Sequence, residues 1–205
     1  MWRVDYHVMF KSYIFMNAEN TRPDHITGNF WKIILKKFRR ILTVSLLTIL
    51  TATALFITGM RFSDGPIAIF TGGEFKSGVL ESAPNDWGYL KERGLIEFQT
   101  LSPARSRTVW LAVYDRRLFI VSGYMNTGYG AIWKQWPYYL NDDDRVILRI
   151  DEALYEQRLE RIIEGPDVVP VLRELSRKYF SGSEGFATQA TVARGDTWMY
   201  EVVDR

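Results

Sequence analysis

Residues 41–60 form an uncharged run, ILTVSLLTILTATALFITGM, that constrains this chain more than any other feature. At a rise of ~1.5 Å per residue, a helix of this length spans the ~30 Å hydrocarbon core of a bilayer. A core helix of a soluble domain would be expected to carry a polar face, and here only hydroxyl side chains interrupt the apolar residues. We therefore expect a single transmembrane helix.

Basic side chains gather immediately before this run. Residues 1–40 carry eight basic and three acidic side chains, and five of the basic ones lie between Lys32 and Arg40. Only Arg61 follows the run closely. Because basic loops stay on the cytoplasmic side, we expect a single-pass protein of the inner (cell) membrane with its N-terminus in the cytoplasm. The predicted parts are a cytoplasmic basic tail (1–40), a transmembrane anchor (41–60) and an extracytoplasmic domain (61–205).

The N-terminal part leaves alternatives open. A cleaved signal peptide is also basic and then apolar, although its apolar stretch usually has ~7–15 residues and no small-x-small cleavage site follows here. Met16 is a second candidate start beside Met1. Residues 17–29 are predicted to be unstructured. Residues 30–38, FWKIILKKF, suit either a helix lying at the membrane surface or the first turns of the membrane helix.

Composition removes several classes of chemistry. The chain has no cysteine, and its two histidines, His7 and His25, precede everything that reads as a folded domain. We therefore expect no disulfide, no metal centre and no Ser-His-Asp hydrolysis. Neither GxGxxG nor a Walker-type loop occurs. Residues 61–205 hold 18 basic and 21 acidic side chains, which argues against a nucleic-acid partner.

Residues 61–205 read as one strand-rich domain. Apolar patterning predicts strands over 95–101, 107–115, 117–123, 145–150 and 153–162. The second and third of these join in a tight hairpin at Asp115 and Arg116. Other predicted elements are a short strand or arm at 65–70, helices at 82–94, 129–140 and 166–180, and a terminal hairpin at 189–203. Consecutive strands lie close together, so the fold class is mainly β with a few helices (α+β), an antiparallel barrel preceded by a single transmembrane helix.

The run SRTVWLAVYDRRLFIVSG is followed by WKQWPYYLNDDDRVILRIDEALYEQRLERI and then by VLRELSRKYF. This series resembles the split β-barrel of flavin- and deazaflavin-binding proteins related to pyridoxamine phosphate oxidase, over about residues 95–180. In it Arg107 opens a strand, Ser122 ends a hairpin and Lys134 lies on a helix. The resemblance implies an antiparallel split β-barrel and FMN or a deazaflavin as cofactor. It also implies oxidoreductase activity on a small molecule and a homodimer that completes the site.

The cofactor implied by the resemblance sets the chemistry of the candidate site. A flavin phosphate needs fixed cations and hydroxyl donors, and its ring needs flat apolar walls. The catalytic residues are unknown; in such a site hydride transfer belongs to the cofactor, and the protein supplies position and electrostatics. Trp110 is a further candidate wall. The candidate cofactor-binding residues are Arg107, Thr108, Ser122, Tyr124, Trp133, Lys134 and Trp136.

An alternative function stays open. Residues 123–133 separate Ser122 from Lys134, whereas the resembling proteins place the basic residue almost directly after the turn. An extracytoplasmic domain is also separated from the cytoplasmic supply of reduced cofactor. The alternative is a non-catalytic, membrane-anchored binding or assembly module that has lost the cofactor site. The tryptophans have a plainer interpretation too, Trp110 as core and Trp133 and Trp136 as anchors of a helix on the sheet.

Overall fold

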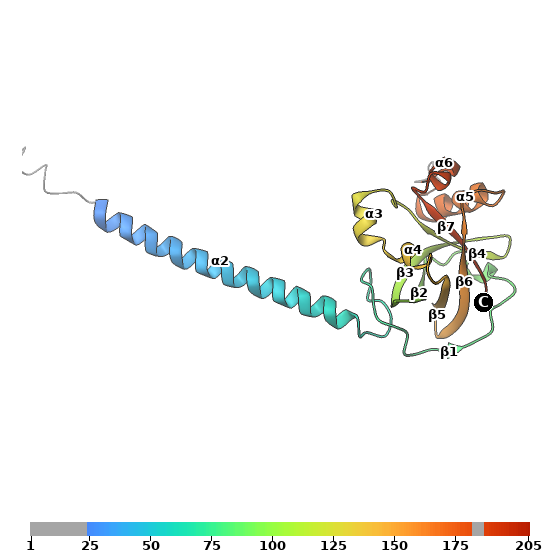
Figure 1. Ribbon diagram of the computed structural model, residues 1–205, viewed down its shortest axis with the longest axis horizontal. Helices are drawn as coiled ribbons and strands as arrows, with labels where there is room; N and C mark the ends of the chain where they lie inside the picture. The colour runs from blue at the N-terminus through green and yellow to red at the C-terminus, as the bar shows by residue number, and fades with distance from the viewer. Residues whose placement is uncertain (1–23, 182–186) are drawn as a thin grey trace, which may run out of the picture. The chain divides into compact units, whose positions relative to one another are not determined.

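The computed structural model describes residues 24–181 and 187–205 (Figure 1). The chain divides into two compact units, Met1–Leu55 and Phe56–Arg205. The described part of the first unit belongs to helix α2 (Asp24–Met60), whose last turn falls in the second unit. The alternative start at Met16 and residues 17–23 of the segment predicted to be unstructured lie outside the described residues.

Helix α2 continues without a break through the uncharged run. Its segment Phe30–Met60 is long and apolar enough to cross a membrane, and the same properties suit a signal sequence. The hydroxyls of Thr43 and Thr48 donate to carbonyls one turn earlier at 2.9 Å, so the helix satisfies these two polar groups itself. Residues 24–29 are helical, contrary to prediction, and residues 30–38 are the first turns of the same helix.

The second unit is a closed barrel of six antiparallel strands. Around the barrel the order is β5, β2, β3, β4, β7 and β6, and β6 pairs with both β7 and β5 to close it. A short strand, β1 (Val79–Leu80), pairs in parallel with the start of β6. The barrel strands are β2 (Leu95–Leu101), β3 (Ala104–Tyr114), β4 (Arg117–Ser122), β5 (Arg145–Ile150), β6 (Ala153–Ile162) and β7 (Trp198–Asp204). The predicted antiparallel split β-barrel is confirmed.

Two apolar clusters hold the barrel together. Every second strand residue points into the barrel, where Phe98, Leu111 and Leu148 are fully buried. A second cluster includes Ala112 and Phe119, whose positions alternate with the inward-facing ones. It packs under helices α5 (Val168–Tyr179) and α6 (Gln189–Ala193), which lie on one side of the barrel in Figure 1. Both faces of β4 and of residues 111–113 of β3 are therefore covered, so these segments read as continuous apolar runs.

The hairpin between β3 and β4 turns at Asp115 and Arg116, as predicted. Their φ angles are 48° and 64°, the pair of positive values that a type I′ turn requires. Asp tolerates this conformation better than most residues because its short side chain can bond locally. The structure thus forms the favoured hairpin turn without the usual glycine.

The predicted terminal hairpin is wrong. Residues 189–193 form α6 because Thr188 caps the helix, with its hydroxyl accepting from Thr191 N and the Thr191 hydroxyl accepting from Thr188 N. A single strand, β7, follows and pairs with β4 and β6. The C-terminal segment, which lies outside the stretch covered by the resemblance, therefore closes the barrel.

Three other predicted elements are shorter or divided. The segment 82–94 contains a short 3₁₀ helix, η1 (Gly88–Leu90), rather than a longer helix. The segment 129–140 forms two helices, α3 (Gly128–Trp133) and α4 (Trp136–Tyr139), since Pro137 lacks the N–H that a continuous helix would use. Residues 65–70 form a turn bridged between Ile67 and Phe70.

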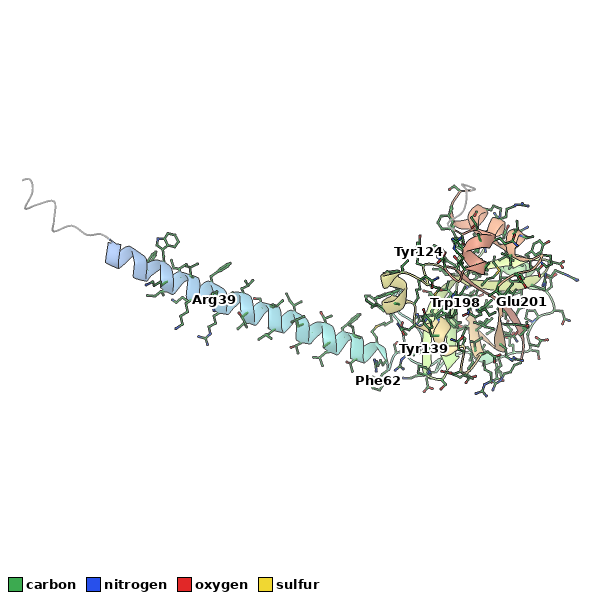
Figure 2. The ribbon with its side chains drawn as sticks, turned by 45° about the horizontal axis from the view of Figure 1, so that its top comes forward. Arg39, Phe62, Tyr124, Tyr139, Trp198 and Glu201 are labelled. Atoms are coloured by element: carbon green, nitrogen blue, oxygen red, sulfur yellow. The ribbon has the colours of Figure 1, made fainter. Side chains whose placement is uncertain are left out.

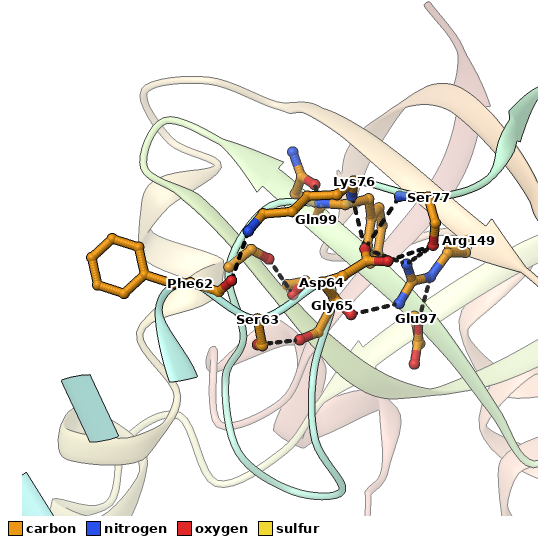
Figure 3. Close-up of polar contacts among 12 residues, drawn as sticks. Phe62, Ser63, Asp64, Gly65, Lys76, Ser77, Glu97, Gln99 and Arg149 are labelled. Carbon is orange, nitrogen blue, oxygen red and sulfur yellow. Dashed lines mark hydrogen bonds and ion pairs between the residues drawn. The ribbon is translucent and has the colours of Figure 1, made fainter. Parts of the chain in front are cut away.

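Asp64 ties the connecting loop, residues 61–78, to the barrel (Figure 3). Its carboxylate accepts from Lys76 N at 2.7 Å and from the Ser77 hydroxyl, and pairs with Arg149 Nη1 at 2.8 Å. Arg149 also pairs with Glu97 on β2, Nε to Oε2 2.7 Å. The hydrogen bonds from Lys76 and Ser77 favour the charged carboxylate and hold the pKa of Asp64 well below its ordinary value.

Candidate functional site

A pocket of about 310 Å³ opens beside β3, β4 and α3. The residues that the sequence singled out converge on it, although they come from two strands and the helical segment that follows them. Ile69 and Thr71 of the connecting loop also line it and were not predicted. All seven candidates are among its lining residues, namely Arg107, Thr108, Ser122, Tyr124, Trp133, Lys134 and Trp136. We call this the candidate cofactor pocket.

Two cations share this pocket, and no Asp or Glu among the described residues lines it. The Nε of Arg107 is buried and has no hydrogen-bond partner, and burial lowers the pKa of Arg107 to about 10. Burial, and then the charge of Arg107, also lower the pKa of Lys134. Neither cation belongs to an ion pair within the described parts of the chain. Two partly buried like charges without a counter-charge are typical of an anion site.

Helix α3 positions Trp133 and Lys134. Thr127 caps the helix, its hydroxyl accepting from Gly130 N at 3.0 Å. Gly130 packs so tightly that a Cβ there would lie 1.9 Å from the carbonyl oxygen of Tyr124. The absence of a side chain at Gly130 therefore lets α3 pack closely against the segment after β4 and hold Trp133 and Lys134 at the pocket.

Tyr124 and Trp133 provide accessible aromatic surface. Tyr124 is 57% exposed (Figure 2), and its φ of 63° sends the chain sharply away from the end of β4. Trp133 is 46% exposed and stacks on Tyr129, with ring centroids 6.5 Å apart and an interplanar angle of 15°. These rings are exposed to solvent, and a flat ligand can stack on such a surface.

The other two tryptophans, Trp110 and Trp136, both line the pocket, and only Trp136 is buried. Trp136 is buried and packs on Phe98 and Tyr200, with ring centroids 4.9 and 5.5 Å away, so it is part of the core as well as the floor of the pocket. The plainer interpretation placed Trp110 in the core, and this is wrong. Trp110 is exposed on the outer face of β3 and stacks on Tyr179 of α5 at 4.8 Å.

The predicted hydroxyl donors are engaged within the chain. Thr108 Oγ1 donates to the carbonyl oxygen of Ala68 at 3.2 Å. Ser122 is buried, and its hydroxyl lies 3.3 Å from the sulfur of Met125. The cations and exposed rings are therefore the groups best placed to contact a ligand.

Comparison with known proteins gives only distant likenesses. No protein-family model and no curated protein matches the amino-acid sequence. A conserved hypothetical protein from Mycobacterium tuberculosis is 13% identical with a TM-score of 0.43, covering 61% of this chain and 86% of its own. An F420 reductase is 14% identical with a TM-score of 0.34, and the match covers 60% of this chain and 96% of the reductase. An FAD-binding protein from Mesorhizobium loti is 13% identical with a TM-score of 0.32, and the match covers 57% of this chain and 84% of that protein. Likenesses this low assign neither a family nor an activity.

Proposed function

We propose that the barrel binds FMN or a deazaflavin in the candidate cofactor pocket, in a protein anchored to the membrane by α2. The observation that carries this proposal is the meeting of two unpaired cations with exposed aromatic rings in one pocket. A phosphorylated tricyclic molecule offers an anion to the first and a flat apolar surface to the second. The pocket volume of about 310 Å³ lies at the lower end of the ~300–1,000 Å³ common for ligand sites.

Arg107 and Lys134 fit the phosphate end of such a cofactor. The guanidinium of Arg107 presents donors in a fixed plane, and its Nε lacks a hydrogen-bond partner among the described residues. Lys134 adds a second positive charge from the end of α3. An anion between them would offset their mutual repulsion and would raise the pKa of both.

Tyr124 and Trp133 fit the ring end. They position the ring and limit the access of water, while the bound flavin or deazaflavin would supply hydride transfer to a small molecule. Among the described residues no Asp, Glu or His lines the pocket, so Tyr124 and Lys134 are the ionisable side chains there best suited to hold a proton near a substrate. This arrangement supports an oxidoreductase more than a hydrolase.

Fluorescence titrations of the full chain in detergent, with FMN and with riboflavin, test this proposal. Riboflavin has the same ring as FMN and lacks the phosphate. Lys134→Gln is expected to weaken FMN binding about tenfold and to leave riboflavin binding unchanged, because it removes one charge-assisted contact. Trp133→Ala is expected to weaken both. Arg145→Gln is the control, since Arg145 is a strand cation paired with Asp143 outside the pocket.

Two results would contradict the proposal. If Lys134→Gln weakened the binding of FMN and of riboflavin equally, Lys134 would not contact the phosphate. Failure of FMN, riboflavin and deazaflavin alike to give a saturable signal would remove the cofactor, and would favour the alternative of a membrane-anchored binding or assembly module.

A further inference from the structure

A second pocket, of about 250 Å³, adjoins the candidate cofactor pocket. Its cations are Arg61, Arg105 and Arg107, and within residues 24–181 and 187–205 no Asp or Glu lines it. The two pockets share Arg107, whereas Arg105 lines only this one and Lys134 lines only the candidate cofactor pocket. We call it the arginine pocket.

The arginine pocket lacks counter-charges. Arg105 donates from Nη1 to the carbonyl oxygen of Ala104 at 2.8 Å, and the buried Nε of Arg107 has no partner. Among residues 24–181 and 187–205, none of its three arginines belongs to an ion pair. Eight other arginines of the barrel unit pair with carboxylates, namely Arg93, Arg117, Arg145, Arg149, Arg158, Arg177, Arg194 and Arg205, whereas Arg116, Arg161 and Arg173 belong to no ion pair among the described residues. What distinguishes this pocket is that three arginines line it together without a carboxylate, which favours an anion from outside the chain.

The arginine pocket lies where the apolar helix ends. The last turn of α2, residues 56–60, belongs to the same compact unit as the barrel, and Phe56 contacts Phe70 of the connecting loop with ring centroids 5.6 Å apart. Ile57 in this turn and Arg61 just after it both line the pocket. If the uncharged residues 41–60 cross the hydrocarbon core, then Ile57 and Arg61, at the end of that run, lie near the depth of the lipid headgroups.

Exposed apolar side chains accompany the arginines. Ile132 lines the pocket and is 80% exposed, while Phe62 (Figure 2) and Ile69 of the connecting loop are 73% and 72% exposed. Trp133, at the pocket wall, is also exposed. Large apolar groups beside cations are unfavourable toward bulk water and typical of a surface that meets a membrane interface.

We propose that the arginine pocket binds the phosphate headgroup of an anionic membrane lipid. The guanidinium groups would contact the phosphodiester, and the lipid chain would run along Ile57 and Ile132 toward the bilayer. Inorganic phosphate offers the same anion without the chain, so the two sources can be separated. The proposal rests on α2 as a membrane span and does not require that the barrel bind a flavin.

Native mass spectrometry of the full chain in a non-ionic detergent tests this site. Phosphatidylglycerol is expected to be retained at least tenfold more tightly than phosphatidylcholine. Arg105→Gln is expected to reduce phosphatidylglycerol retention about tenfold and to leave FMN binding unchanged, whereas Lys134→Gln is expected to do the reverse. Arg145→Gln, outside both pockets, should change neither. Arg61→Gln, on an exposed side chain, repeats the test without risk to folding.

The outcomes separate the two proposals. Equal retention of the two lipids, or undiminished phosphatidylglycerol retention in Arg105→Gln and Arg61→Gln, would overturn the lipid site. Displacement of phosphatidylglycerol by an equal concentration of inorganic phosphate would overturn it too, since the lipid chain would then contribute nothing. Weakened FMN binding in Arg105→Gln would show that the arginine pocket is part of the cofactor site. It would contradict a separate lipid site and agree with the proposed function. Phosphatidylglycerol retention without any flavin binding would remove the proposed function alone.

Discussion

Arginine residues of the barrel unit occupy two kinds of environment. Most are tied to carboxylates, often far away in sequence, as Arg149 is to Asp64. Arg107 has no such partner, and because burial lowers its pKa to about 10, its charge opposes folding at neutral pH. This penalty is fully present below pH ~10 and fades as the pH rises toward the ordinary arginine value. A cation kept at such a cost is better explained by a ligand than by stability.

Asp64 is the residue whose removal is expected to release the connecting loop. Asp64→Asn removes the negative charge of this carboxylate. The carboxylate accepts hydrogen bonds from Lys76 N and the Ser77 hydroxyl and pairs with Arg149. Hydrogen exchange of the amides in residues 61–78 is therefore expected to accelerate at pH 7. Because the pKa of Asp64 is lowered on folding, its contribution is present above the ordinary value near 4 and is lost as the pH falls below it. In the wild type, exchange corrected for intrinsic rates should rise below pH ~4.

Asp151→Asn supplies the control for this prediction. It also removes an ion pair, with Arg93, but its carboxylate does not contact the connecting loop. The exchange of residues 61–78 should not change. Equal acceleration in both variants would mean that net charge, rather than the Asp64 contacts, holds the loop.

Strands and helices whose apolar residues recur at a regular spacing were predictable from the sequence. Elements marked only by a single residue pair were not. The strands at 95–101, 145–150 and 153–162 agree with prediction to the residue, since alternating side chains face the barrel interior. Helix α6 was missed because five residues are too few to show a helical period. Its one signal was the pair Thr188 and Thr191, which form the capping box.

The candidate site followed the same rule. Its seven predicted residues lie on one hairpin and the helical segment after it, so proximity in sequence already places them together. Arg61, Ile69, Thr71 and Arg105 were missed. The first three reach their pockets through a loop that has no repeating pattern and is fixed by contacts across the fold, such as that between Asp64 and Arg149.

Helix α3 depends on one glycine, which gives a prediction at the scale of the element. Gly130→Ala would place a Cβ 1.9 Å from the carbonyl oxygen of Tyr124, so α3 must move away from the barrel. We expect a loss of about 1–3 kcal/mol in the free energy of unfolding. FMN binding should weaken at the same time, because Trp133 and Lys134 move with the helix. Thermal unfolding and FMN titration of the full chain in detergent measure the two effects.

Gly128→Ala, in the same helix, is the matched control. No atom lies within 4 Å of a Cβ built at Gly128, and alanine favours a helix by about 0.5 kcal/mol. This variant should be slightly more stable than the wild type and should bind FMN equally well. Wild-type FMN affinity in Gly130→Ala would show that the position of α3 does not matter to the pocket.

At the scale of the whole molecule, the proposed lipid site depends on the predicted anchor, because Ile57 in the last turn of α2 and Arg61 just after it line the arginine pocket. Homodimerisation stays a prediction. So do the anchor and its orientation, which rest on the length and apolarity of residues 41–60 and on the basic side chains before them.

Protease accessibility tests the orientation. In spheroplasts of a bacterial host, added protease is expected to degrade residues 61–205 and to spare the N-terminal tail, detected with a tag at each end of the chain. The physical reason is the five basic side chains between Lys32 and Arg40, which resist transfer across the membrane. Replacing all five with Gln should therefore yield a mixed population in which part of the barrel is protected. A protected barrel in the wild type would reverse the topology, and a mature chain lacking the N-terminal tag would mean that α2 belongs to a cleaved signal peptide.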